Sequence, residues 1–201
     1  MNDWLKEVVL EGDQVELIPL KREHKNELVA AAGDGELWKL WFTSIPSVDT
    51  IEQYIDFALA ELEQGRALPF VVVLKAENKI IGTTRLCNAV PAHKRLEIGY
   101  TWYSKEHQRT GINTECKYLL LTHAFENLNC IAVEFRTHWH NQMSRNAIAR
   151  LGAKQDGILR NHMIDADGSL RDTVVFSILR DEWAVVKKSL VYKMNKYKIK
   201  E

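Results

Sequence analysis

Residues 108–114, with the sequence Gln-Arg-Thr-Gly-Ile-Asn-Thr, are of the types that can bind an anionic group. A strand pattern precedes this segment and a helix pattern follows it, so it should form the start of a helix. The first backbone N–H groups of a helix have no intrahelical partner, and the helix dipole adds positive charge there. Gly111 would let the backbone approach an anion, and Gln108 could donate a side-chain hydrogen bond. The segment indicates either a phosphate or pyrophosphate site or a simple helix start.

Two widespread phosphate-binding motifs are absent from this segment. No Gly-Lys-Ser/Thr run follows Gly111, so it is not a Walker loop. No Gly-x-Gly-x-x-Gly pattern is present either, so it is not a dinucleotide fingerprint.

Glu97 and Ser144 have side chains of types that can accept or donate protons. Glu97 is expected on the same strand face as Gly99, where its carboxylate could act as a general base through a water molecule. The alternative is a surface carboxylate paired with Arg95 or Lys94. Ser144 could stabilise or protonate a leaving group, or its hydroxyl could bond only to the backbone of a helix start.

His138 and His140 flank Trp139 just after a strand pattern and would share a face, which suggests a metal site. No third and fourth ligand occurs at a recognisable spacing, so we expect no metal. One histidine could be an alternative base, or both could be polar loop residues. Arg160 and His162, expected on one face of a later strand, could bind an acidic substrate group or simply lie on the sheet surface.

A dense aromatic segment contains Trp38, Trp41 and Phe42 before Pro46. Aromatic clusters of this kind usually pack in a core.

Hydrophobic periodicity predicts the elements that position these residues. Strands at 70–74, 79–87 and 95–103, joined by short loops, indicate an antiparallel meander. A buried helix at 112–128 before a strand at 131–135 implies one parallel pair. The result is an α/β (α+β) fold with a mixed, mostly antiparallel sheet of about seven strands. The other predicted elements are strands at 15–19, 153–163 and 170–179, and helices at 23–32, between Asp49 (N-cap) and Gly65 (C-cap), and at 142–151 between Asn141 (N-cap) and Gly152 (C-cap).

The pattern Gln108-x-x-Gly111-x-Asn113 resembles the pyrophosphate loop of GNAT acetyltransferases, usually Gln/Arg-x-x-Gly-x-Gly/Ala. Asn113 departs from the family pattern in the last position, where its side chain could alter the helix start or contact the anion. Other segments match in order: residues 97–102 resemble the family's fourth strand, 141–144 the start of its fourth helix, and 152–153 with 171–177 its closing hairpin. The resemblance runs from about residue 14 to residue 183. It is closest to the branch that includes acetyltransferases of ribosomal-protein N-termini.

The resemblance implies a GNAT fold, with helices on both faces of the sheet and acetyl-CoA in a cleft where the family's fourth and fifth strands separate. It implies that the backbone of Tyr100, Thr101 and Trp102 aligns the pantetheine arm and polarises the thioester. Asn141 could bond to the pantetheine amides or serve only as an N-cap. The pyrophosphate would be held by Gln108 and by the backbone of Arg109, Thr110, Gly111, Ile112, Asn113 and Thr114.

The family chemistry implied is direct attack of an amine on the acetyl carbonyl, with Glu97 as base, Ser144 near the leaving thiolate and no metal. The acceptor could be a protein N-terminus, a lysine, an aminoglycoside-like drug or a polyamine. Candidate acceptor contacts are Trp38, Trp41, His138, Arg160 and His162. The alternatives are a non-catalytic acyl-CoA-binding sensor or interaction module of this fold, and an RNA-associated protein acting through its lysines.

Composition indicates one globular domain, residues 1–201, with 46% hydrophobic and 27% charged residues. The formal net charge of zero argues against a nucleic-acid partner. Residues 184–201 form a lysine-rich segment, expected to be a solvated helical tail. The three cysteines form no disulfide framework, and no apolar run reaches the roughly 20 residues needed to cross a bilayer. We therefore expect a cytoplasmic monomer or homodimer without a membrane partner.

Isothermal titration calorimetry tests this interpretation of the chain. We expect acetyl-CoA and CoA to bind in the micromolar range and ATP to bind weakly, because the pantetheine arm adds contacts that ATP lacks. Acetyl-CoA should also raise the melting temperature. No heat and no thermal stabilisation at saturating acetyl-CoA would mean that residues 108–113 are only a helix start.

Overall fold

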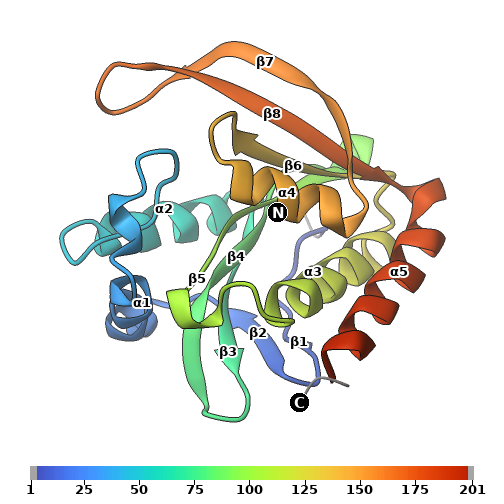
Figure 1. The fold of residues 1–201 in the computed structure, drawn as a ribbon, viewed down its shortest axis with the longest axis horizontal. Helices are drawn as coiled ribbons and strands as arrows, with labels where there is room; N and C mark the ends of the chain where they lie inside the picture. The colour runs from blue at the N-terminus through green and yellow to red at the C-terminus, as the bar shows by residue number, and fades with distance from the viewer. Residues whose placement is uncertain (1–3, 199–201) are drawn as a thin grey trace.

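The computed structural model describes residues 4–198, which form one eight-stranded sheet covered by helices (Figure 1). The strand order is β1-β2-β3-β4-β5-β6-β8-β7. All neighbours are antiparallel except β5 and β6, which are parallel. The strands are β1 (Leu10–Glu11), β2 (Val15–Pro19), β3 (Leu68–Leu74), β4 (Lys79–Val90), β5 (Arg95–Tyr103), β6 (Ala132–His138), β7 (Lys154–Ile164) and β8 (Leu170–Leu179). The α-helices are α1 (Lys25–Gly33), α2 (Ile51–Glu63), α3 (Ile112–Thr122), α4 (Gln142–Leu151) and α5 (Arg180–Lys198).

The predicted fold class is confirmed, including the single parallel pair across α3. The sheet has one strand more than the seven that periodicity indicated. The additional strand, β1, has only two residues, which is too short to produce a periodic pattern.

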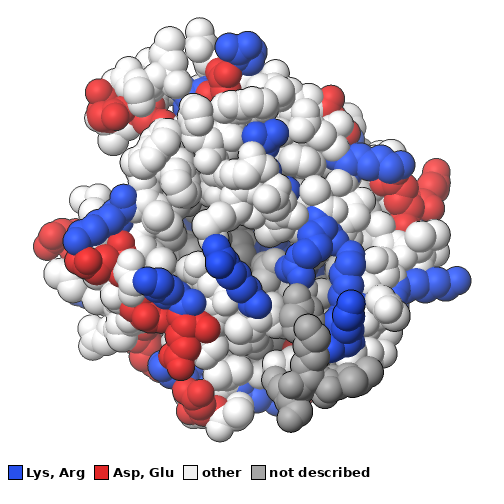
Figure 2. Space-filling model, in the orientation of Figure 1, with Lys and Arg blue, Asp and Glu red and all other residues white. Residues whose placement is uncertain are grey.

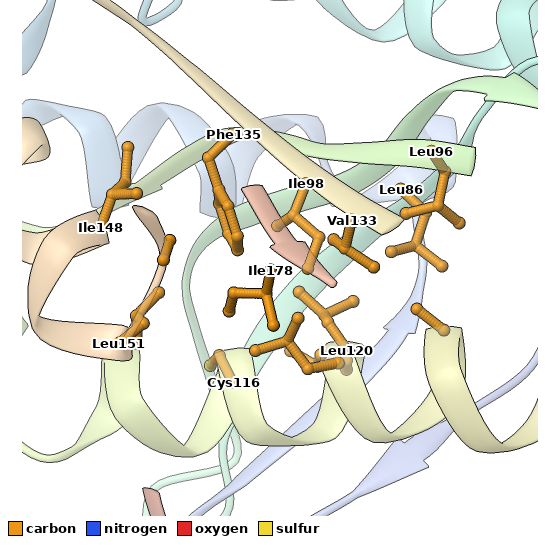
Figure 3. Packing of buried hydrophobic residues seen from close by; sticks show 14 of the residues in the cluster. Leu86, Leu96, Ile98, Cys116, Leu120, Val133, Phe135, Ile148, Leu151 and Ile178 are labelled. Carbon is orange, nitrogen blue, oxygen red and sulfur yellow. The ribbon is translucent and has the colours of Figure 1, made fainter. Parts of the chain in front are cut away.

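Each face of the sheet has its own hydrophobic core. On β3, Phe70 and Val72 point into the core beneath α3, α4 and α5, while Val71 and Val73 point into the core beneath α1 and α2. This alternation follows from the two-residue period of a strand that is buried on both sides. Figure 3 shows the first core, in which α3 and α4 pack against the sheet.

The helix predicted at 112–128 consists of two parts. α3 ends at Thr122, and the chain continues as a π-helical turn, His123–Asn127.

The prediction of Asp49 as N-cap of α2 is wrong, because Thr50 occupies that position. The Thr50 hydroxyl accepts a hydrogen bond from the Ser47 amide at 2.8 Å, so a local serine–threonine turn determines where the helix begins.

The lysine-rich segment is not simply solvated. It belongs to α5, which begins at Arg180 and buries Trp183, Val186 and Leu190 in the core beneath α3. Residues 199–201 lie outside the described residues. Among the helices that the structure describes, none has the length and apolarity to cross a membrane.

Candidate active site

β5 and β6 separate partway along their length, and the opening between them is the candidate active site. Three residue pairs join the two strands, and the last is Glu97 opposite Glu134. Beyond that pair, β5 continues against β4 alone and β6 continues against β8 alone. Two strand edges therefore face each other without pairing, and such edges can bind an extended ligand through main-chain hydrogen bonds.

A bulge in β5 borders this opening. Tyr100 has φ of 50°, in the left-handed region that non-glycine residues rarely adopt. Neither Tyr100 nor Thr101 has a partner residue in β4, and pairing resumes at Trp102 opposite Thr83. The three residues expected along the pantetheine arm thus lie at the opening, but the Trp102 side chain is buried in the core beneath α1 and α2.

The turn before α3 presents backbone N–H groups that no described residue accepts: those of Arg109, Thr110 and Gly111. Arg109 has φ of 63°, and a left-handed residue within a turn lets successive N–H groups converge on an anion. Lys and Arg side chains lie across the middle of this face, over α3 and α5 (Figure 2). These unpaired donors at the positive end of α3 fit a pyrophosphate group.

Two side chains of this turn have internal partners. Gln108 Nε2 donates to the Tyr103 carbonyl at 2.9 Å, so at least one of its amide N–H groups braces the turn. Asn113 Oδ1 accepts a hydrogen bond from the Tyr103 hydroxyl at 3.3 Å. The side chain that departs from the family pattern is therefore held by β5. Ile112 and Thr114 have buried side chains, and their backbone N–H groups donate to Thr110 Oγ1 at 3.3 Å and to the Gly111 carbonyl at 3.0 Å.

Glu97 is buried at the closed end of the opening, with 8% of its surface exposed. Asn88 Nδ2 donates to its carboxylate at 2.8 Å, and Arg136 Nε lies 3.7 Å away. Burial raises the pKa of Glu97 above its ordinary value, against the opposing effects of Asn88 and Arg136. A Cβ built on Gly99 would lie 3.1 Å from Glu97 Oε1, so the two residues share a face as expected.

The alternative interpretation of Glu97 as a surface partner of Arg95 or Lys94 is wrong. Arg95 Nε donates instead to Glu134 at 3.1 Å, because the parallel pairing of β5 with β6 brings Glu134 beside it. Lys94 forms no described ion pair with Glu97. A buried carboxyl group whose pKa is raised, at the point where two strands separate, is a candidate general base.

Asn141 and Ser144 lie at the start of α4, just after β6. Asn141 Oδ1 accepts the Ser144 amide at 3.0 Å, which confirms Asn141 as the N-cap. The Ser144 hydroxyl bonds to no described residue, so it stays available as a donor.

A polar cavity of about 240 Å³ lies at the end of β6. Trp41 lies against both histidines here, with its ring centroid 5.1 Å from that of His138 and 5.7 Å from that of His140. Trp38 instead packs against the core beneath α1 and α2. The cavity is lined by His138, Trp139, His140, Arg160, Asn161, Leu170 and Asp172.

His138 is poorly suited to act as a base. Its Nδ1 accepts the His140 amide at 3.0 Å, so the proton of the neutral ring is on Nε2, which lies 3.6 Å from Asp165. Burial lowers the pKa of His138 below its ordinary value, which favours this neutral form. In residues 4–198, no cluster of histidine, cysteine and carboxylate side chains could hold a metal ion.

Arg160 and His162 do not share a face, contrary to expectation. Arg160 Nε bonds to Asp172 at 2.5 Å, whereas His162 Nδ1 lies 3.1 Å from the Thr173 hydroxyl. Asp172 and Thr173 are consecutive residues of β8, so their side chains point to opposite faces of the sheet. Arg160 and His162, which contact them, therefore also lie on opposite faces. The cause is a bulge at Asn161, which has φ of 48° and breaks the alternation in β7. Of these two residues, Arg160 lines the polar cavity and His162 does not.

Sequence reasoning missed two buried cations near the bulge, Arg85 and Lys117. The Arg85 guanidinium lies between the Tyr54 and Tyr100 rings, 4.5 Å and 4.1 Å from their centroids. Its Nε and Nη1 atoms have no described hydrogen-bond partner. No local pattern marks either residue, because Arg85 follows Thr83 and Thr84 and Lys117 follows Glu115 and Cys116 in segments that already contain polar residues.

Comparison with known proteins agrees with this geometry. Residues 14–154 match the acetyltransferase (GNAT) domain, which is more than half of the chain. A crystal structure of a GCN5-related N-acetyltransferase from Brucella melitensis is 31% identical, with a TM-score of 0.85 over 94% of this chain and 86% of that one. The chain therefore belongs to the GNAT acetyltransferase family.

Two sequence relatives define the activity further. The uncharacterized N-acetyltransferase p20 of Bacillus licheniformis is 28% identical over 71% of this chain and 78% of p20. The Escherichia coli enzyme named [ribosomal protein uS5]-alanine N-acetyltransferase is 25% identical over 60% of this chain and 62% of that protein. The chain is an N-acetyltransferase, and its relatives include an enzyme named for the acetylation of a ribosomal protein.

The anion site at α3 can be tested by adding charge without adding bulk. Gly111→Asp and Gly111→Asn introduce side chains of the same size, but only aspartate places a negative charge beside the pyrophosphate. We expect CoA to bind at least about tenfold more weakly to the aspartate variant than to the asparagine variant, with a larger difference at low salt. The measurement is calorimetric titration, with melting curves to show that both variants fold. Equal affinities would place the anion elsewhere.

Proposed function

We propose that this chain transfers the acetyl group of acetyl-CoA to a primary amine, with the α-amine of a protein N-terminus as its acceptor. One arrangement carries the proposal: the buried carboxyl group of Glu97 and the bulge at Tyr100 border the same opening, and the strand that holds them is followed, after a short 3-10 turn, by the candidate anion-binding turn at Gly111. Attack by an amine on a thioester is helped by a base and by a carbonyl-polarising group, and binding of CoA is helped by a phosphate site; we assign these roles to Glu97, the Tyr100 backbone and the turn at Gly111.

In the proposed step, the amine nitrogen bonds to the acetyl carbonyl carbon, and the carbonyl π electrons move to oxygen. When these electrons return, the carbon–sulfur bond breaks and its electron pair leaves on the CoA thiolate. Glu97 accepts the proton that the amine loses, through a water molecule. The backbone near Tyr100 stabilises the oxyanion, and the Ser144 hydroxyl donates a hydrogen bond to the thiolate.

The choice of an α-amine as acceptor follows from how easily each kind of amine loses its proton. An α-amine has a pKa near 8, whereas a lysine amine has one of about 10.4, so the α-amine is far more easily converted to its nucleophilic form. The relative that acts on the alanine of a ribosomal protein supports an N-terminal acceptor. The cavity lined by His138 and Arg160, where the Trp41 ring contacts His138, would hold the residues that follow the acceptor amine.

An assay of CoA thiol release tests the acceptor. The comparison is between peptides with a free N-terminal alanine or serine, the same peptides blocked at the N-terminus but containing lysine, and spermidine. We expect release only with free N-termini. Release with the blocked peptides or spermidine alone would overturn the N-terminal assignment, and binding of acetyl-CoA without release from any amine would favour a non-catalytic module.

Glu97→Gln should lower kcat by about 10²-fold or more, because it removes the base, and should leave CoA affinity unchanged. In the parent enzyme, kcat should rise with pH through the raised pKa of Glu97, since only the carboxylate accepts a proton. The variant should lack this rise. Glu134→Gln, which changes the carboxylate directly opposite on β6, is the matched control. A Glu97→Gln variant as fast as the parent would remove Glu97 from the mechanism.

A further inference from the structure

Lys117 lies in α3 on the side that packs against the sheet, with only 5% of its surface exposed. Its neighbours along this side, Cys116, Leu120 and Leu121, are fully buried members of the core. A lysine ammonium in such a place loses its hydration, which is costly unless other groups compensate. An apolar side chain would satisfy the packing, so the charge at this position requires another explanation.

The Lys117 ammonium has hydroxyl partners but no counter-ion among the described residues. Nζ donates to Thr101 Oγ1 at 2.6 Å and to Thr84 Oγ1 at 3.2 Å. The nearby titratable groups are Cys87 on β4 and Cys116 on α3 itself, and burial raises the pKa of both thiols, so they are neutral. Desolvation lowers the pKa of Lys117 to about 8, which leaves it mainly charged at neutral pH.

The hydroxyl groups connect Lys117 to the backbone of the β5 bulge. Thr101 Oγ1 donates to the Gly99 carbonyl at 3.3 Å, and Thr84 lies 2.8 Å from the Thr101 hydroxyl. The Gly99 carbonyl and the Tyr100 N–H belong to one planar peptide unit and point in opposite directions. A bond that fixes this carbonyl therefore fixes the direction of the Tyr100 N–H.

A second set of bonds holds the next peptide from the opposite face of the sheet. Thr83 Oγ1 donates to the Tyr100 carbonyl at 3.0 Å and lies 2.9 Å from the Tyr54 hydroxyl on α2. Tyr100 is thus held between two networks in a backbone conformation that is unfavourable for a non-glycine residue. Such conformations persist only where surrounding contacts over-determine them.

We propose that Lys117 is a positioning residue for acetyl transfer, which through Thr101 orients the Gly99–Tyr100 peptide at the opening and adds positive charge beneath the developing oxyanion. The inference rests on the proposed function. Negative charge forms on the carbonyl oxygen during the step, and a fixed, desolvated cation stabilises it more strongly than solvent does. Lys117 itself neither touches the substrate nor exchanges a proton with it.

The test is Lys117→Met in the full chain, assayed by thiol release with the best amine acceptor. We expect kcat to fall about tenfold or more, while the KM and Kd for acetyl-CoA change less than about twofold. The melting temperature should stay the same or rise, because replacing a buried charge with an apolar side chain is often neutral or stabilising. Lys188→Met, the same substitution at an exposed position of α5, is the control and should leave kcat unchanged.

Thr101→Val tests whether Lys117 acts through the hydroxyl. If it does, Lys117→Met should lower kcat much less in the Thr101→Val background than in the parent, because the two changes interrupt one pathway. Independent, multiplicative effects on kcat would overturn this route. The Thr101→Val variant and the parent's pH profile remain informative even if Lys117→Met fails to fold.

The pH dependence separates an electrostatic role from a packing role. The parent's kcat should decline on the alkaline side as Lys117 loses its proton near pH 8, and Lys117→Met should show no such decline. Because the folded pKa lies below the unfolded value, the unfolded chain binds more protons between about pH 8 and 10.4. The parent should therefore gain stability relative to Lys117→Met as pH rises through that window.

The outcomes distinguish this inference from the proposed function. If the parent releases thiol and Lys117→Met matches its kcat and pH profile, the positioning role is wrong and the acetyltransferase proposal stands. A lower melting temperature with unchanged kcat would make Lys117 a purely structural residue. If the parent transfers acetyl to no amine, both proposals fall together.

Discussion

The early end of the pairing between β5 and β6 is the constraint on which the rest of the molecule depends. Three residue pairs hold the strands together, and beyond Glu97 each strand keeps only its antiparallel neighbour. The opening this creates is stable because both cores continue on either side of it, beneath α3 on one face and α2 on the other. The bulge at Tyr100 borders this opening, and β5 is followed by a short 3-10 turn and then by the helix start at Gly111.

Charged groups are buried around the opening at a cost that packing alone would not justify. Glu97 lies at its closed end, while Arg85 and Lys117 lie on opposite faces of β4 and β5. None of the three has an ideal ion-pair partner among the described residues: Glu97 has Arg136 at 3.7 Å, and the two cations have aromatic rings or hydroxyls. Buried charges that lower the stability of a fold at one place are typical of a functional site.

Local patterns were sufficient to predict most of the helices and strands. The alternation in β5, the apolar side of α3 and the Gln108 to Asn113 segment each depend on residues close in sequence. The N-cap at Asn141 and the left-handed Gly152 were likewise predictable from single residue types. Errors arose where a short turn intervened, as at Asp49, or where a strand had only two residues, as in β1.

The sequence by itself determined the order of strands and helices, the parallel pair and the position of the turn before α3, because period and turn chemistry are local properties. Tertiary structure alone decided the partners of the charged side chains. Arg95 pairs with Glu134 and leaves Glu97 buried, Trp41 reaches His138, and the bulge at Asn161 separates Arg160 from His162. Lys117 became visible as an unusual residue only when α3 was packed on the sheet. The physical reason is that burial and ion pairing depend on which surfaces meet, and those surfaces come from segments far apart in the chain.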